Sequence, residues 1–314
     1  MNFGDGTLGR LAIHLQSQRP LSFLKSMTTG NKKRTVAAGL PPGKNCFSLI
    51  SKRKLLDLYC TMLKCRMIAE CARIILEQNK LNDGGCAAGG LEAVAAGVVI
   101  DLLPEDTISP SPRDLMACFV KGVPPHALFS HLQAHAAKRG KDHASRGRME
   151  IAIGLARANK MKNNNKIVVV FCDEECPAPG SPHKALKVAG AENLPMIFVS
   201  RNNLQTDVGA PTLKTQTYGF PRITVDSNDV VAIYRVASEA IAHARLGHGP
   251  TLIECKPYRV RGHSEAGPTV DRDGEAVQRW KADNPLLNME KYLTRKGLFS
   301  ERYKRKVAAG SVAL

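Results

Sequence analysis

Polar side chains follow two apolar runs that are typical of buried strands. Asp173 comes shortly after the run KIVVVF at residues 166–171, and Asn202 and Asn203 follow LPMIFVS at residues 194–200. If the two strands are parallel neighbours, these side chains meet at one edge of a sheet. A carboxylate, an amide oxygen and a nearby backbone carbonyl suit Mg²⁺, which completes its octahedron with phosphate oxygens and water. The alternative role for each side chain is to cap the helix after its strand.

A second candidate site lies in residues 249–264, which read GPTLIECKPYRVRGHS. A glycine-proline turn leads into an apolar strand at 251–255, and Arg259, Arg261 and His263 follow. Such a strand carries positive charge and a titratable base to the carboxyl edge of a sheet, where open α/β sheets bind ligands. The alternative is that His263 is an ordinary loop histidine.

The elements that position these residues alternate along the chain. Helical spacing of apolar residues begins at 52–78, and the helix predicted over 91–103 is rich in small residues, which permits close packing. Further helices are predicted over residues 127–137, 149–159, 180–191 and 229–245, with strands at 166–171, 194–200, 251–255 and one ending at 226. This alternation predicts an α/β fold, with a mostly parallel sheet flanked by helices.

Composition narrows the function classes. Lys and Arg outnumber Asp and Glu by 45 to 28, which gives +17 and suggests a phosphorylated ligand or an acidic protein surface. Aromatic residues make up only 5% and no nucleic-acid-binding motif is present, so we expect no nucleic acid partner. No apolar run is long enough to span a membrane. The nine cysteines have no zinc-type spacing and indicate buried thiols in a reducing compartment.

Residues 1–45 differ from the rest of the chain. They hold one acidic residue, Asp5, and are rich in Lys, Arg, Ser and Gly. This composition predicts a basic disordered arm, with an organellar transit peptide as the alternative. We therefore expect a single domain over residues 46–314. The location is cytoplasmic if the protein is bacterial, or the mitochondrial matrix if residues 1–45 are a transit peptide.

The order of several motifs resembles one known family. The run at 249–264 is similar to the GPxLIE…YRxxGHS segment of the α subunit of thiamine-diphosphate-dependent 2-oxo acid dehydrogenases, the E1 component of the pyruvate and branched-chain complexes. Cys172-Asp173-Glu174 stands where that family has GDG, and residues 175–201 separate it from Asn202-Asn203, close to the family spacing. The resemblance covers about residues 52–300.

Two motifs further upstream continue the resemblance. Met62, Arg66 and Glu70 match the family's M-x3-R-x3-E pattern, and Gly90-Leu91-Glu92-Ala93 is similar to its GQEA element. Arg113 stands in Ser111-Pro112-Arg113-Asp114, where the family has Tyr-Arg.

The resemblance implies a thiamine-diphosphate-binding fold and a set of ligands. Asp173, Asn203 and the backbone carbonyl of Gln205 correspond to Mg²⁺ ligands. Arg113 corresponds to a ligand of the cofactor diphosphate, the alternative being a surface arginine. His263 corresponds to the catalytic histidine beside the cofactor. The implied activity is oxidative decarboxylation of a 2-oxo acid, pyruvate or a branched-chain acid, with transfer of the acyl group to lipoyl. The implied partners are an E1 β subunit, in a heterotetramer, and a lipoyl-bearing E2 component.

The chain also departs from the family pattern. Cys172 and Glu174 replace both glycines of GDG, and Glu174 and Glu175 add negative charge beside Asp173. The family's GIVG segment has no counterpart before Met149. The alternative function is therefore a catalytically impaired E1 α-like subunit that serves in assembly or interaction. His131 and His135 lie one helical turn apart, but no acidic residue joins them at ligand spacing, so we predict no metal there.

Overall fold

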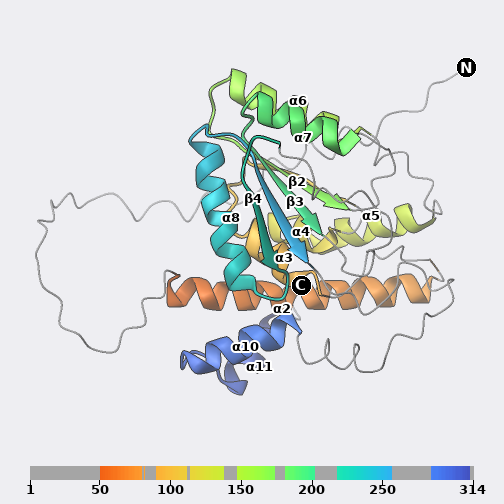
Figure 1. Ribbon diagram of the computed structural model, residues 1–314. Helices are drawn as coiled ribbons and strands as arrows, with labels where there is room; N and C mark the ends of the chain where they lie inside the picture. The colour runs from red at the N-terminus through yellow and green to blue at the C-terminus, as the bar shows by residue number, and fades with distance from the viewer. Residues whose placement is uncertain are drawn as a thin grey trace, which may run out of the picture. The chain divides into compact units, whose positions relative to one another are not determined.

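The structure is a computed structural model of the 314-residue chain (Figure 1). It describes residues 50–79, 81, 90–111, 114–137, 147–173, 181–201, 218–256 and 284–311. All helices and strands named below belong to the unit Lys52–Leu314. The predicted arm at residues 1–45 lies outside the described residues.

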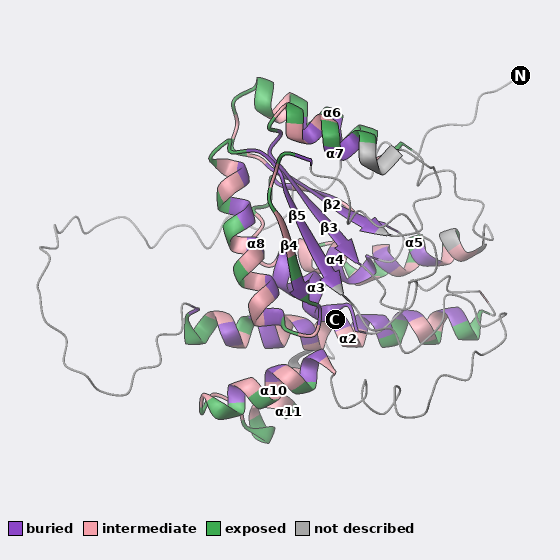
Figure 2. Cartoon of the chain, viewed as in Figure 1, coloured by how far each residue is buried: buried purple, intermediate pink, exposed green. Residues whose placement is uncertain are grey.

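A parallel sheet of five strands forms the centre of this unit. Its order is β1-β2-β3-β5-β4, and every neighbouring pair is parallel. The strands are β1 (Thr107–Ser109), β2 (Val168–Asp173), β3 (Met196–Arg201), β4 (Arg222–Asp226) and β5 (Thr251–Lys256). The inner strands β2 and β3 are buried along their described lengths (Figure 2), as expected of a parallel sheet covered on both faces. The predicted α/β fold is confirmed.

Helices pack on both faces of the sheet or on the helices that cover those faces. They are α2 (Lys52–Gln78), α3 (Glu92–Val99), α4 (Leu115–Lys121), α5 (Pro125–Ala137), α6 (Arg148–Met161), α7 (Ser181–Ala191), α8 (Val230–Arg245), α10 (Pro285–Arg295) and α11 (Glu301–Ser311). Val168, Val170 and Cys172 of β2 pack in one cluster with α6 and α7. Phe171 lines a small cavity with residues of α3 and α4, so those helices cover the opposite face.

Helix boundaries follow local chemistry. The α8 helix begins where Asp229 accepts hydrogen bonds from the backbone amides of Val231 and Ala232, at 2.9 and 3.0 Å. The α3 helix is shorter than predicted and ends at Val99 instead of residue 103. Its small residues do allow close packing, because a Cβ at Gly97 would lie 2.7 Å from Ile233 Cγ2 of α8.

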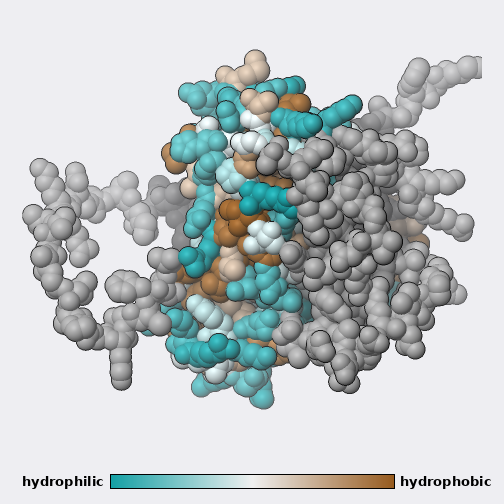
Figure 3. Space-filling model, viewed as in Figure 1, coloured by the Kyte–Doolittle hydropathy of each residue, from teal (hydrophilic) through white to brown (hydrophobic). Residues whose placement is uncertain are grey.

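The described surface is mainly hydrophilic, as expected when apolar residues are buried around the sheet. On the face shown in Figure 3, hydrophilic side chains cover most of the described surface, with a narrower hydrophobic strip between them. Within the described residues, no helix has the length and apolar character needed to cross a bilayer.

Candidate active site

The carboxyl ends of β2 and β3 lie side by side. Asp173, the last residue of β2, is the register partner of Arg201, the last residue of β3. The two predicted strands are therefore parallel neighbours that end at one edge. Asn202 follows Arg201 directly in the sequence. The β5 strand pairs with β3 in the same direction, so the segment after Lys256 also leaves the sheet at this edge. The predicted arrangement of the strands is confirmed.

The side chains of the predicted site residues are outside the described part of the structure. Asp173 closes β2, but only its backbone is described. Arg113, Asn203, Gln205 and His263 lie outside the described residues. Their assigned roles therefore remain predictions.

Cys172 occupies the first glycine position of the expected GDG motif. Its side chain is buried in the cluster between β2 and helices α6 and α7. Alternate strand residues point to opposite faces of a sheet, and Cys172 points to the same face as Val170 and Val168. The larger side chain is thus accommodated inside the core.

A buried ion pair joins the end of β3 to the segment before α4. Arg201 Nη1 lies 2.8 Å from Asp114 Oδ1, and the two side chains are 1% and 4% exposed. Arg201 Nη2 donates to Ser111 Oγ at 2.9 Å. Asp114 Oδ2 also accepts a hydrogen bond from the Ser111 backbone amide at 2.7 Å. These contacts fix the segment on either side of Arg113 against the carboxyl edge of the sheet.

Sequence reasoning missed this pair. Ser111 and Asp114 lie on either side of Arg113 in the sequence, and Arg201 directly precedes Asn202. An arginine at the end of an otherwise apolar strand was the available signal, since such a side chain needs a buried acidic partner.

A second buried contact joins the two upstream motifs. Glu92, in the first turn of α3, is fully buried and accepts a hydrogen bond from Arg66 Nε at 2.6 Å. Arg66 Nη2 also donates to Asn284 Oδ1 at 3.2 Å, which links α2 and α3 to the start of α10. Burial, together with the Glu92 carboxylate, raises the pKa of the neighbouring Cys65 thiol above its usual range. These contacts therefore hold α2, α3 and the start of α10 together.

The described residues contain no group of three His, Cys, Asp or Glu side chains that could hold a metal ion. His131 is exposed on α5 and the side chain of His135 is not described. The Mg²⁺ ligands predicted at Asp173, Asn203 and Gln205 fall where side chains are not described, and they stay predictions.

With the fold and this edge established, the family can be assigned. The family described as "Dehydrogenase E1 component" matches residues 59–311, which include every strand of the sheet. The chain belongs to the dehydrogenase E1 component family. Membership of the E1 family implies thiamine diphosphate as the cofactor.

Named relatives include three E1-type α subunits. The 3-methyl-2-oxobutanoate dehydrogenase subunit alpha of Mycobacterium tuberculosis is 33% identical over 245 residues, which cover 70% of this chain and 65% of the relative. The chloroplastic pyruvate dehydrogenase E1 component subunit alpha-3 of Arabidopsis thaliana is 29% identical, covering 82% and 68%. The 2-oxoisovalerate dehydrogenase subunit alpha of Bacillus subtilis is 28% identical, covering 80% and 85%. The chain thus spans just under two thirds of the mycobacterial relative.

Proposed function

We propose that this chain is the α subunit of a 2-oxo acid dehydrogenase E1 component. It would act in the oxidative decarboxylation of pyruvate or a branched-chain 2-oxo acid, with transfer of the acyl group to lipoyl. Membership of the E1 family and the α-subunit names of its relatives support this proposal. The observation that carries it is the pairing of Asp173 with Arg201 at the carboxyl edge of the sheet, because Arg201 directly precedes the Asn202-Asn203 motif in the sequence.

The predicted ligands have the chemistry that the cofactor needs. The carboxylate of Asp173, the amide oxygen of Asn203 and the carbonyl of Gln205 are hard oxygen ligands, which suit Mg²⁺ bound to a diphosphate. Arg113 would bind the diphosphate oxygens, for which the guanidinium fork is well shaped. The replacement of the first glycine by Cys172 is compatible with this role, since the Cys172 side chain lies in the core.

When bound, thiamine diphosphate supplies the carbanion chemistry that decarboxylates a 2-oxo acid. The protein itself would hold the cofactor and neutralise the charge of its diphosphate. Asp173 and Asn203 would fix the metal ion, Arg113 would neutralise the diphosphate, and His263 would orient the substrate carboxylate or move a proton at its imidazole nitrogen.

The proposed partners follow from the same assignment. We infer that the chain binds an E1 β subunit, in a heterotetramer, and delivers its product to a lipoyl-bearing E2 component. The names of the relatives as alpha subunits support this inference. No nucleic acid or membrane partner is proposed.

Calorimetry tests the proposed function. The chain, co-purified with its β-type partner, would be titrated with thiamine diphosphate in the presence of Mg²⁺. We expect saturable binding, which Asp173→Ala abolishes because it removes the charged metal ligand. The matched control is Asp226→Ala, which removes an exposed carboxylate from the last residue of β4 at the same edge. We expect this control to leave binding unchanged.

Absence of heat at millimolar cofactor would overturn the enzyme proposal. The chain would then be a non-catalytic E1 α-like subunit. Equal loss of binding in Asp173→Ala and Asp226→Ala would instead show that Asp173 is not a specific ligand.

A further inference from the structure

We propose that Arg201 is a positioning residue for the cofactor site. Through its buried ion pair with Asp114, it would fix Arg113 and Asn203 relative to Asp173. This inference rests on the function proposed above, since that function assigns the three ligands. No contact of Arg201 with the cofactor itself is required.

The contacts of Arg201 tie together segments that are distant in the sequence. Arg201 and Asp114 are separated by 87 positions, yet their charged groups approach to 2.8 Å inside the protein. The Arg201 guanidinium uses a second nitrogen for Ser111 Oγ, and Asp114 holds the Ser111 amide. Removing one partner of such a buried pair leaves an uncompensated charge, so the local structure must rearrange.

Covalent connectivity links this pair to the predicted ligands. Arg113 is one peptide bond from Asp114, and Asn203 is two peptide bonds from Arg201. Consecutive Cα atoms lie about 3.8 Å apart, so each predicted ligand is tied closely to one member of the ion pair. Asp173 is the register partner of Arg201 in the sheet. The ion pair and the strand pairing together therefore set the spacing between the three chain segments that would supply diphosphate and metal ligands.

The surroundings of the pair argue that Arg201 acts through Asp114. The cavity beside the two charged groups measures about 10 Å³, which is room for about one water molecule. Its other lining residues are mainly apolar and come from α3, α4 and β2. A cofactor diphosphate does not fit in this space, so the Arg201 guanidinium would influence the site by positioning.

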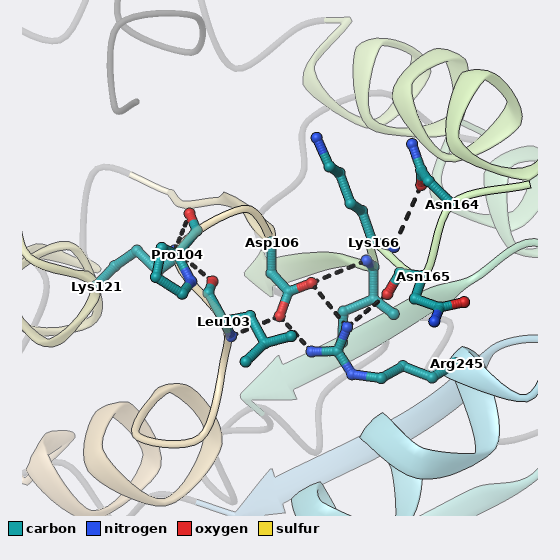
Figure 4. A network of polar contacts seen from close by, with 9 residues as sticks. Leu103, Pro104, Asp106, Lys121, Asn164, Asn165, Lys166 and Arg245 are labelled. Atoms are coloured by element: carbon teal, nitrogen blue, oxygen red, sulfur yellow. Dashed lines mark hydrogen bonds and ion pairs between the residues drawn. The ribbon is translucent and has the colours of Figure 1, made fainter. Parts of the chain in front are cut away.

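The opposite edge of the same sheet offers a matched control. Asp106, just before β1, is buried and forms an ion pair of 2.5 Å with Arg245 at the end of α8 (Figure 4). Its carboxylate also accepts hydrogen bonds from the backbone amides of Leu103 and Ile167. This pair resembles Asp114–Arg201 chemically, but it lies at the amino edge, far along the strands from the predicted ligands.

The experiment compares Arg201→Met with Arg245→Met in the complex with the β-type partner. Calorimetry would measure the affinity for thiamine diphosphate and Mg²⁺, and hydrogen exchange would measure the protection of backbone amides. We expect Arg201→Met to weaken binding by about tenfold to a hundredfold, as supporting residues around metal ligands do. We expect Arg245→Met to stay within about twofold of the wild type.

Hydrogen exchange should locate each effect. Arg201→Met should expose the Ser111 amide to exchange, whereas Arg245→Met should do so at Leu103 and Ile167. Because Arg201→Met removes a buried charge and folding could suffer, Ser111→Ala and Arg201→Lys serve as gentler variants. Ser111→Ala removes one acceptor, and lysine keeps the charge without the fork, so both should lose affinity to a smaller extent.

The outcomes separate the two proposals. If the wild type binds the cofactor and Arg201→Met and Ser111→Ala bind it equally well, the positioning role is overturned while the proposed function stands. If Arg201→Met and Arg245→Met weaken binding alike, the effect is one of general stability and the positioning role is overturned. If the wild-type complex binds no cofactor, the proposed function fails and the positioning role fails with it.

Discussion

At the scale of single residues, Cys255 shows how the sheet controls the chemistry of a side chain. It lies in β5 beside Arg201, the register partner of both Cys255 and Asp173, and is fully buried. Burial raises the pKa of its thiol to about 12, although the nearby Arg201 charge opposes this shift and Glu254 adds to it. The structure thus favours the neutral thiol, as expected of a cysteine that packs in a core.

This shift predicts a loss of stability in alkaline solution. A raised folded-state pKa gives stability that is complete below the unfolded value of 9.0 and is lost as pH rises toward about 12. Urea titrations would give the free energy of unfolding at pH 8 and at pH 10.5. Its decrease between these pH values should be smaller in Cys255→Ala than in the wild type, by about 1–2 kcal/mol.

The control for this experiment is Cys71→Ala, because the Cys71 side chain is exposed on α2. It should follow the wild type across the pH range. A Cys255→Ala variant with the wild-type pH dependence would show that the Cys255 thiol is not protected from ionisation by the fold.

At the scale of elements, the contact between α3 and α8 depends on one glycine. A Cβ at Gly97 would meet Ile233 Cγ2 at 2.7 Å and the Tyr234 backbone nitrogen at 3.2 Å. The backbone atom has little room to move, so a methyl group there must push the two helices apart. The short distance between these two helices therefore requires Gly97. Both helices lie on the face of the sheet to which Phe171 points.

Gly97→Ala should lower the free energy of unfolding by about 1–3 kcal/mol, the usual cost of overpacking. The matched control is Gly154→Ala on α6, where a Cβ meets no atom within 4 Å. Since alanine favours helix, this control should raise stability by up to about 1 kcal/mol. Chemical denaturation measures both, and stabilisation by Gly97→Ala would contradict the close packing of α3 on α8.

The elements were predictable in type more than in extent. Continuous apolar runs predicted β2, β3 and β5, and helical spacing predicted α2 and α8 to within a residue of their observed bounds. Two short elements, β1 and α4, were not predicted. Three residues of strand and seven of helix give too short a pattern to be recognised, and tertiary contacts stabilise them. The α4 helix, for example, begins at Leu115, directly after Asp114, which is held by Arg201.

At the scale of the whole molecule, the location of the protein is a proposal that depends on residues 1–45. Their basic, acid-poor composition predicts a disordered arm, with an organellar transit peptide as the alternative. A fluorescent protein fused to residues 1–45 and expressed in eukaryotic cells should therefore remain in the cytosol. Import into the mitochondrial matrix would contradict this expectation and identify the segment as a transit peptide.

The sequence by itself determined the family and which polar residues follow each predicted strand. Motif order and spacing carry this information, because each strand is followed by the residues that its carboxyl edge presents. Asp173, Asn203, Gln205, Arg113 and His263 remain predictions from that pattern.

Only the tertiary structure decided how the buried charged side chains pair. The pairs Asp114–Arg201, Glu92–Arg66 and Asp106–Arg245 join segments far apart in the chain. Each pairing depends on strand order and helix packing, which place one buried charge within reach of another. No local pattern encodes such a pairing, because the cost of an unpaired buried charge exists only once the chain has folded.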